Sequence, residues 1–183
     1  MFWISKKIVT YQEIWEEGFL DLHNHLIPGI DDGSKSLDQT KKMIEGMKNL
    51  GITESIATPH TYPGLWDNKK EDIENAYQSI SDSFIKKCSS EYFADEYLIN
   101  LAISGELLTL KDNYILIEFS MIGPPNDNIL DTLFQLKLKD YRLILAHPER
   151  YQYWDKDLKL FEQLKSFVYV FKLKWTFPKR VFS

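Results

Sequence analysis

Short apolar runs alternate with stretches of helical periodicity along most of this chain, which is the pattern of β/α units around a parallel sheet or barrel. The clearest predicted strands are GFLDLHNHL (18–26), ESIATPH (54–60), NYILIEFS (113–120) and YRLILAHPER (141–150). A weaker run, EYFADEYL, predicts a short strand that ends near Glu96, and SFVYVFKL (166–173) is a last apolar run. The pattern therefore predicts an α/β fold.

Between these runs, apolar side chains recur at helical spacing. Ser36 and Gln39 resemble a capping box at the start of a helix that ends at Gly51. The other predicted helices run from about 69 to 88, around 130–138 and within 156–165.

Composition limits the function classes. With 183 residues, 44% of them hydrophobic, the chain fits one globular domain, and a formal net charge of −5 disfavours a nucleic-acid partner. Cys88 is the only cysteine, which excludes a disulfide framework and favours the cytoplasm. No signal peptide or membrane span is predicted.

Residues capable of metal binding gather where predicted strands end. They are all four histidines and two glutamates, namely His23, His25, His60, Glu96, Glu118 and His147. In β/α barrels the side chains at the carboxyl ends of the strands build the active site, so we expect these six to converge. His23 and His25 point the same way if the first run is a strand, because strand side chains alternate between faces.

Each residue also has a simpler interpretation. A single histidine after a strand is more often a loop or core residue than a ligand, and Asp31 and Asp32 are suited to hold a turn before a helix. Only the joint placement favours a metal site. Imidazole and carboxylate without thiolate suit Mn²⁺, Fe²⁺ or Zn²⁺, and shared carboxylates permit a multinuclear centre.

Three further observations concern phosphate chemistry. Arg150, three residues after His147, is placed to hold a phosphate with its planar guanidinium. A cysteine-dependent tyrosine phosphatase needs an arginine six positions after its nucleophile, and Cys88 has Ala94 there. No glycine-rich nucleotide-binding loop is present.

The chain contains the stretches DLHNHLIPGIDDGSKS, GITESIATPH, ADEYLIN, YILIEFS and LAHPERY. These stretches, in this order, resemble the PHP (polymerase and histidinol phosphatase) superfamily, and within it the metal-dependent bacterial tyrosine-protein phosphatases of capsule and exopolysaccharide control. The resemblance implies a distorted (β/α)₇ barrel and a phosphotyrosine substrate on a cognate autophosphorylating kinase. The implied metal ligands are His23, His25, Asp32, His60, Glu96, Glu118 and His147, with Arg150 on the phosphate.

The resemblance has a limit at the C-terminal end. Family members continue for about two more β/α units with a late Asp-x-His, whereas no histidine follows His147 here. We expect an N-terminal extension (1–19), an incomplete PHP phosphatase domain (20–166) and a divergent tail (167–183), as in a truncated or frameshifted member. Weak metal binding, weak activity and oligomers or aggregates would follow.

Two other functions stay open at this point. One is another PHP phosphoesterase, such as a histidinol phosphatase, although the PGIDDG and HPERY strings argue against it. The other is a non-catalytic remnant or kinase-binding module, which the missing late ligands favour.

Overall fold

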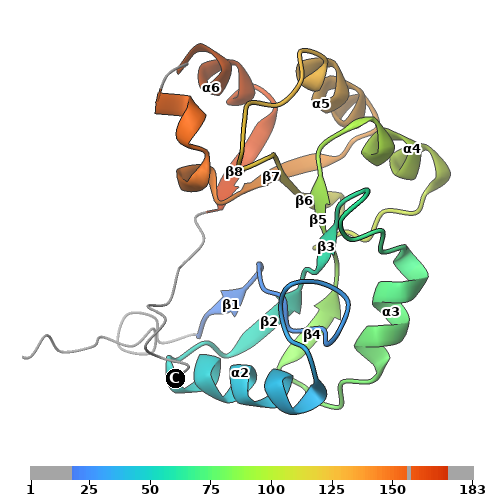
Figure 1. The fold of residues 1–183 in the computed structure, drawn as a ribbon, viewed down its shortest axis with the longest axis vertical. Helices are drawn as coiled ribbons and strands as arrows, with labels where there is room; N and C mark the ends of the chain where they lie inside the picture. Colours follow the sequence, from blue (N-terminus) through green and yellow to red (C-terminus); the bar gives the residue numbers. More distant parts are fainter. Residues whose placement is uncertain (1–17, 156–157, 173–183) are drawn as a thin grey trace, which may run out of the picture.

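A computed structural model describes residues 18–155 and 158–172 (Figure 1). The strands are β1 (Leu20–Asp21), β2 (Glu54–Ala57), β3 (His60–Thr61), β4 (Ile85–Cys88), β5 (Glu91–Phe93), β6 (Tyr114–Glu118), β7 (Arg142–Ala146) and β8 (Val168–Lys172). The α-helices are α2 (Leu37–Asn49), α3 (Lys70–Gln78), α4 (Glu96–Ser104), α5 (Ile129–Leu138) and α6 (Leu158–Leu164). Two short 3₁₀ helices, η1 (Pro148–Arg150) and η2 (Gln152–Asp155), follow β7.

The strands form two parallel sheets. One has the order β1-β2-β4 and the other β3-β5-β6-β7-β8, and every strand pair in both sheets is parallel. In Figure 1, α2 and α3 lie around the smaller sheet, while α4, α5 and α6 cover the larger one. The predicted α/β class is confirmed, whereas a closed barrel stays a prediction because the described strands form two separate sheets.

The central strands β6 and β7 are buried on both faces. Ile115, Ile117 and Leu145 pack with helix residues such as Leu133, while Leu116 belongs to a second cluster on the opposite face of the sheet. Such continuous apolar strands are typical of parallel sheets that are covered on both sides. This packing fixes the strand ends, and therefore the side chains that follow them.

The long helix predicted over 69–88 is wrong in its second half. The helix α3 ends at Gln78, and Ile85–Cys88 forms β4 instead. Ile80 and Phe84 continue the helical apolar spacing, but Asp82 accepts a hydrogen bond from the Phe84 amide at 2.8 Å and holds a turn there. Only Ile85 and Cys88 of the strand are buried, so its apolar pattern is weak.

Two other predicted strands are divided. The run ESIATPH gives β2 and then β3, which belong to different sheets. The run EYFADEYL gives β5 and then the start of α4, which Asp95 caps by accepting a hydrogen bond from the Leu98 amide at 3.2 Å. The strand thus ends at Phe93, not near Glu96.

In the part of the chain that the structure describes, no helix has the length and apolar character needed to cross a membrane. The predicted N-terminal extension lies almost wholly outside the described residues. The segment assigned above to the C-terminal tail contains β8, which pairs in parallel with β7. The domain boundaries themselves stay a prediction.

Candidate metal centre

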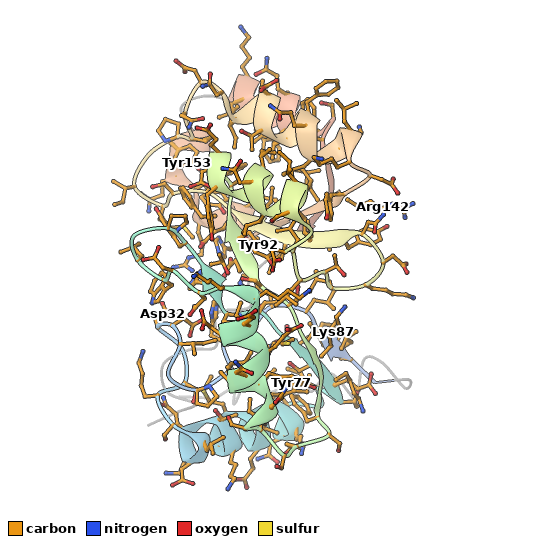
Figure 2. All side chains as sticks on the ribbon, turned by 90° about the vertical axis from the view of Figure 1, so that its right-hand side faces the viewer. Asp32, Tyr77, Lys87, Tyr92, Arg142 and Tyr153 are labelled. Atoms are coloured by element: carbon orange, nitrogen blue, oxygen red, sulfur yellow. The ribbon has the colours of Figure 1, made fainter. Side chains whose placement is uncertain are left out.

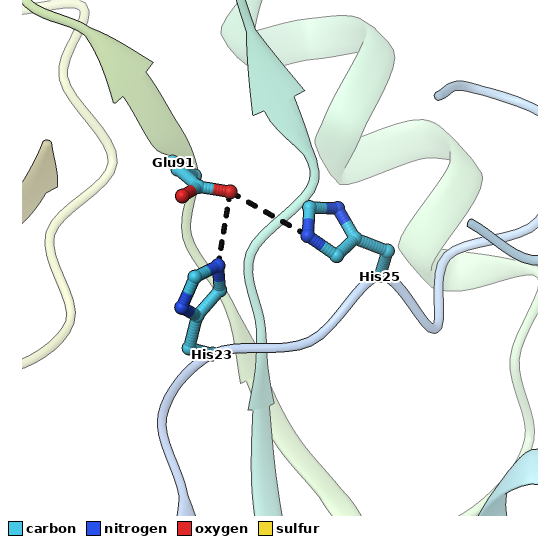
Figure 3. A group of neighbouring side chains, drawn as sticks. All are labelled: His23, His25 and Glu91. Atoms are coloured by element: carbon cyan, nitrogen blue, oxygen red, sulfur yellow. Dashed lines mark ion pairs between the residues drawn. The ribbon is translucent and has the colours of Figure 1, made fainter. Parts of the chain in front are cut away.

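Glu91, the first residue of β5, lies at the centre of the histidine cluster. Its carboxylate is fully buried and has imidazole nitrogens on several sides. Figure 3 shows the His23 and His25 rings facing one Glu91 oxygen, with their Nε2 atoms 3.0 and 3.5 Å from Oε2. The His147 Nε2 lies 2.7 Å from the other oxygen, Oε1, and the His60 Nδ1 lies 3.4 Å from Oε2.

Glu118 adds a second buried carboxylate on the neighbouring strand. Its Oε1 lies 2.8 Å from the His60 Nδ1, and its Oε2 lies 3.7 Å from the His147 Nε2. The parallel registers place His60 beside Glu91, and Phe93 beside Glu118, at one edge of the larger sheet. All four histidines of the chain therefore meet two carboxylates there.

The unsatisfied hydrogen-bonding capacity of this cluster fits a bound cation. The His60 Nδ1, Glu91 Oε2 and Glu118 Oε1 atoms are buried and have no hydrogen-bond partner of good geometry. The His60 Nδ1 lies 2.8 Å from the Glu118 oxygen and 3.4 Å from the Glu91 oxygen. Buried polar atoms without partners are costly, so a group of close-lying lone pairs of this kind fits the coordination of a positive ion.

Three groups of ligand atoms in the described residues are compact enough to hold an ion. They are His23–His25–Glu91, His25–Asp32–His60 and His60–Glu91–Glu118, with the ligand atoms of each group within 4.8 Å of one another. His25, His60 and Glu91 each belong to two groups. Shared ligands of this kind are suited to a multinuclear centre of imidazole and carboxylate, without thiolate.

The charges of the cluster compensate one another. Burial alone would raise the pKa of Glu91, but the charges and hydrogen bonds of His23, His147 and His60 outweigh it and hold that pKa well below its usual range. Burial, together with the like charge of Glu91, raises the pKa of Glu118. Burial would lower the pKa of His60, but the Glu118 carboxylate 2.8 Å from its Nδ1 raises it.

The His-x-His segment is held from its opposite side. Asn24 donates hydrogen bonds from Nδ2 to the Ser55 hydroxyl at 2.7 Å and to the Ile56 carbonyl at 3.0 Å. Because Asn24 is anchored on β2, its two neighbours His23 and His25 face away from β2 and toward Glu91. The predicted common face is confirmed, even though the strand itself ends at Asp21.

Asp31 has a supporting role. Its buried carboxylate lies 2.7 Å from the His25 Nδ1 and accepts hydrogen bonds from the Gly33 amide at 2.8 Å and the His60 amide at 3.1 Å. The turn-holding interpretation of Asp31 is therefore confirmed. The contact also fixes the orientation of the His25 ring, so that Nε2 faces the cluster. Carboxylates commonly orient the histidine ligands of metal sites in this way.

Tyr151 braces the ends of β6 and β7. Its hydroxyl accepts a hydrogen bond from the Phe119 amide at 3.0 Å and donates one to the Ala146 carbonyl at 3.1 Å. These two residues flank Glu118 and His147. His147 itself has a left-handed backbone (φ 33°), which is uncommon for a residue with a side chain and turns the chain from β7 into η1.

Three predicted site residues lie apart from the buried cluster or at its edge. Asp32 is 62% exposed and its Oδ1 lies 3.6 Å from the His60 Nε2, so it borders the open side of the cluster. Figure 2 shows Asp32 on a loop at the left-hand margin of the molecule. Arg150 ends η1 with an exposed side chain. Glu96 is exposed on the first turn of α4, where it lines a polar pocket between α4 and α5.

The structure thus brings together His23, His25, His60, Glu118 and His147 as predicted, but it puts Glu91 in the place expected for Glu96. Asp95 followed by apolar residues at 98, 99 and 102 and by Gly105 is a helix signal, and it would have moved Glu96 out of the strand. Glu91 was missed because it begins its strand instead of ending it.

Several known proteins are similar to this chain in sequence, and a solved structure is similar in fold. The family profile described as "Capsular polysaccharide synthesis, CpsB/CapC" matches residues 19–174. The tyrosine-protein phosphatase YwqE of Bacillus subtilis is 31% identical over 140 residues, which are 72% of this chain and 54% of YwqE. The tyrosine-protein phosphatase CpsB of Streptococcus pneumoniae is 26% identical over 153 residues, 79% of this chain and 63% of CpsB.

One solved structure, from work on YwqE and on CpsB of S. pneumoniae described as metal-dependent tyrosine phosphatases, superposes with a TM-score of 0.74 at 24% identity. The match covers 83% of this chain and 65% of that one, and it shows that the fold is shared. The chain spans about half the length of the first curated relatives that it matches. On the extent of the profile match and the identity to YwqE, the chain belongs to the CpsB/CapC family of capsular polysaccharide synthesis.

Proposed function

We propose that this chain is a metal-dependent phosphotyrosine phosphatase. It would act on a cognate bacterial tyrosine kinase in the control of capsule or exopolysaccharide synthesis. The observation that carries the proposal is the burial of four imidazoles around Glu91 and Glu118, with lone pairs that do not satisfy one another. The family membership, and the phosphatases YwqE and CpsB within it, support the same activity.

The ligands in this proposal are His23, His25, Asp32, His60, Glu91, Glu118 and His147. Mn²⁺ is the first candidate ion, with Fe²⁺ and Zn²⁺ as alternatives, because the donors are nitrogen and oxygen only. When bound, such ions make a nucleophile from water at neutral pH and compensate charge on phosphoryl oxygens. The product would be inorganic phosphate and a free tyrosine hydroxyl.

The chain's own residues would complete the site. Arg150, directly after the His147 turn, would hold two phosphoryl oxygens through its guanidinium. Asp31 would keep His25 oriented. A cysteine mechanism is disfavoured, since Cys88 is buried and its burial, followed by the charge of Glu74, raises the pKa of its thiol.

The closed barrel, the cytoplasmic location and the possible homo-oligomer belong to the same proposal, and each stays a prediction. The resemblance of the chain to PHP phosphatases supports the barrel. The single cysteine supports a reducing compartment.

Phosphate release from a phosphotyrosine peptide tests the proposal. We expect release that requires added Mn²⁺ and exceeds release from histidinol phosphate. A preference for histidinol phosphate would instead indicate another PHP phosphoesterase. A chain that binds the metal but hydrolyses neither ester would refute catalysis and favour a kinase-binding module.

A further inference from the structure

The loop after β3 places an aromatic side chain directly against the metal cluster. The Trp66 indole stacks on the His60 imidazole with ring centroids 4.5 Å apart and an interplanar angle of 12°. His60 is the residue that contacts Glu91, Glu118 and Asp32. Trp66 therefore covers one face of a shared candidate ligand.

The geometry of the loop fixes Trp66 in this position. The Tyr62 and Trp66 backbones exchange two hydrogen bonds, of 2.9 and 2.8 Å, which close a tight turn. Asn68 then ties the loop back by donating to the His60 carbonyl at 2.8 Å and to the Ile30 carbonyl at 2.9 Å. An aromatic surface held in this way loses little entropy when a ligand contacts it.

A second aromatic pair extends this surface toward Glu118. Tyr62 stacks on Phe93 with centroids 3.9 Å apart, and Phe93 is the register partner of Glu118. Tyr62 also meets Trp66 edge to face at 6.4 Å. We define these three side chains, Tyr62, Trp66 and Phe93, as the aromatic wall.

The aromatic wall lies on the open side of the cluster. The side chains of His60, Glu91 and Glu118 are at most 10% exposed, whereas Asp32, beside the same His60 ring, is 62% exposed. Each wall residue keeps part of its surface exposed, and Leu65 at the tip of the turn is 63% exposed. A substrate that reaches the cluster from the Asp32 side therefore passes this apolar rim.

We infer that the aromatic wall, and Trp66 in particular, selects aryl over alkyl phosphates. This inference rests on the proposed function. In an aryl phosphate the ring is attached to the bridging oxygen, so it lies in the layer just outside a phosphate held at the cluster. Aromatic contact with a fixed ring stabilises that complex, whereas an alkyl phosphate places no ring there.

Calorimetric binding of two non-hydrolysable probes tests the inference. The Mn²⁺-loaded full chain should bind phenylphosphonate about tenfold more tightly than methylphosphonate, as one aromatic contact provides. Trp66→Ala should remove most of that preference and leave methylphosphonate binding unchanged, while Trp66→Phe should retain it. The control is Phe134→Ala, a half-exposed aromatic on α5, which should change neither affinity.

Two outcomes would overturn the inference. One is an equal loss of affinity for both probes in Trp66→Ala together with a lower Mn²⁺ content, because Trp66 would then act only by positioning His60. The other is the absence of any aryl preference in the parent chain. Failure of the proposed function is separate, since it would appear as an absence of phosphate release despite selective phenylphosphonate binding.

Discussion

Glu91 is the residue whose replacement tests the metal centre most directly. Glu91→Gln keeps the shape of the side chain but removes the negative charge that faces His23, His25, His60 and His147 at 2.7 to 3.5 Å. It also removes an anionic ligand from two of the three compact groups. We therefore expect weaker binding of at least two ions.

The size of the loss in stability can be calculated, because metal binding to the folded chain stabilises it in proportion to the logarithm of one plus the ratio of the metal concentration to Kd. Loss of residues that merely support a metal ligand commonly weakens metal binding about 10- to 100-fold, so about 100-fold is a modest expectation for a ligand itself. At a free metal concentration 100 times the parent Kd, binding stabilises the parent by about 2.7 kcal/mol. After a 100-fold weakening, the same concentration stabilises Glu91→Gln by about 0.4 kcal/mol.

Thermal unfolding with and without Mn²⁺ measures this difference. For a chain of this size, a loss of roughly 2.3 kcal/mol corresponds to a metal-induced rise in Tm that is about 5 to 9 °C smaller than in the parent. Metal content of the purified protein, measured by mass spectrometry, gives an independent readout. Phosphate release from a phosphotyrosine peptide should fall with it.

Glu96→Gln is the matched control, because it makes the same chemical change on the exposed first turn of α4. It should leave the metal-induced Tm rise, the metal content and the activity unchanged. If Glu96→Gln lost the Tm rise while Glu91→Gln kept it, the ligand assignment made from the sequence would be right and the one made from the structure would be wrong.

Three further predictions concern the rest of the site. Arg150→Ala should abolish phosphotyrosine hydrolysis while metal content and Tm stay unchanged, and Arg142→Ala at the start of β7 should keep full activity. Gly33→Ala should lower Tm and metal content together, because an added Cβ would overlap the His25 side chain and carbonyl, whereas Gly123→Ala, with open space around it, should change neither. Removal of metal with a chelator should abolish activity and lower Tm, and added Mn²⁺ should restore both, whereas activity that survives chelation would contradict a metal mechanism.

The sequence predicts those parts of the site that depend on strand ends. Glu118 and His147 follow strongly apolar runs, so their positions at one edge of a parallel sheet could be anticipated. His60 also reached the cluster, although the run that contains it divides between two sheets. For Glu118 and His147, the burial of β6 and β7 on both faces left little choice of register.

Glu91 and Glu96 show where sequence reasoning failed. Both glutamates lie in one short run in which strand and helix signals overlap, and periodicity alone does not separate them. The pairing of β5 between β3 and β6 decides which carboxylate is buried. That pairing is a long-range property, which a local pattern does not contain.

The division of the strands into two sheets also has a dynamic consequence. His23 and His25 follow β1 of the smaller sheet, whereas Glu91 and Glu118 belong to the larger one. An ion shared by both sets would link the two sheets, and their opening motions would become coupled. Amide hydrogen exchange should then slow in both sheets together when Mn²⁺ is added, including in β2 and β8, which supply no ligand.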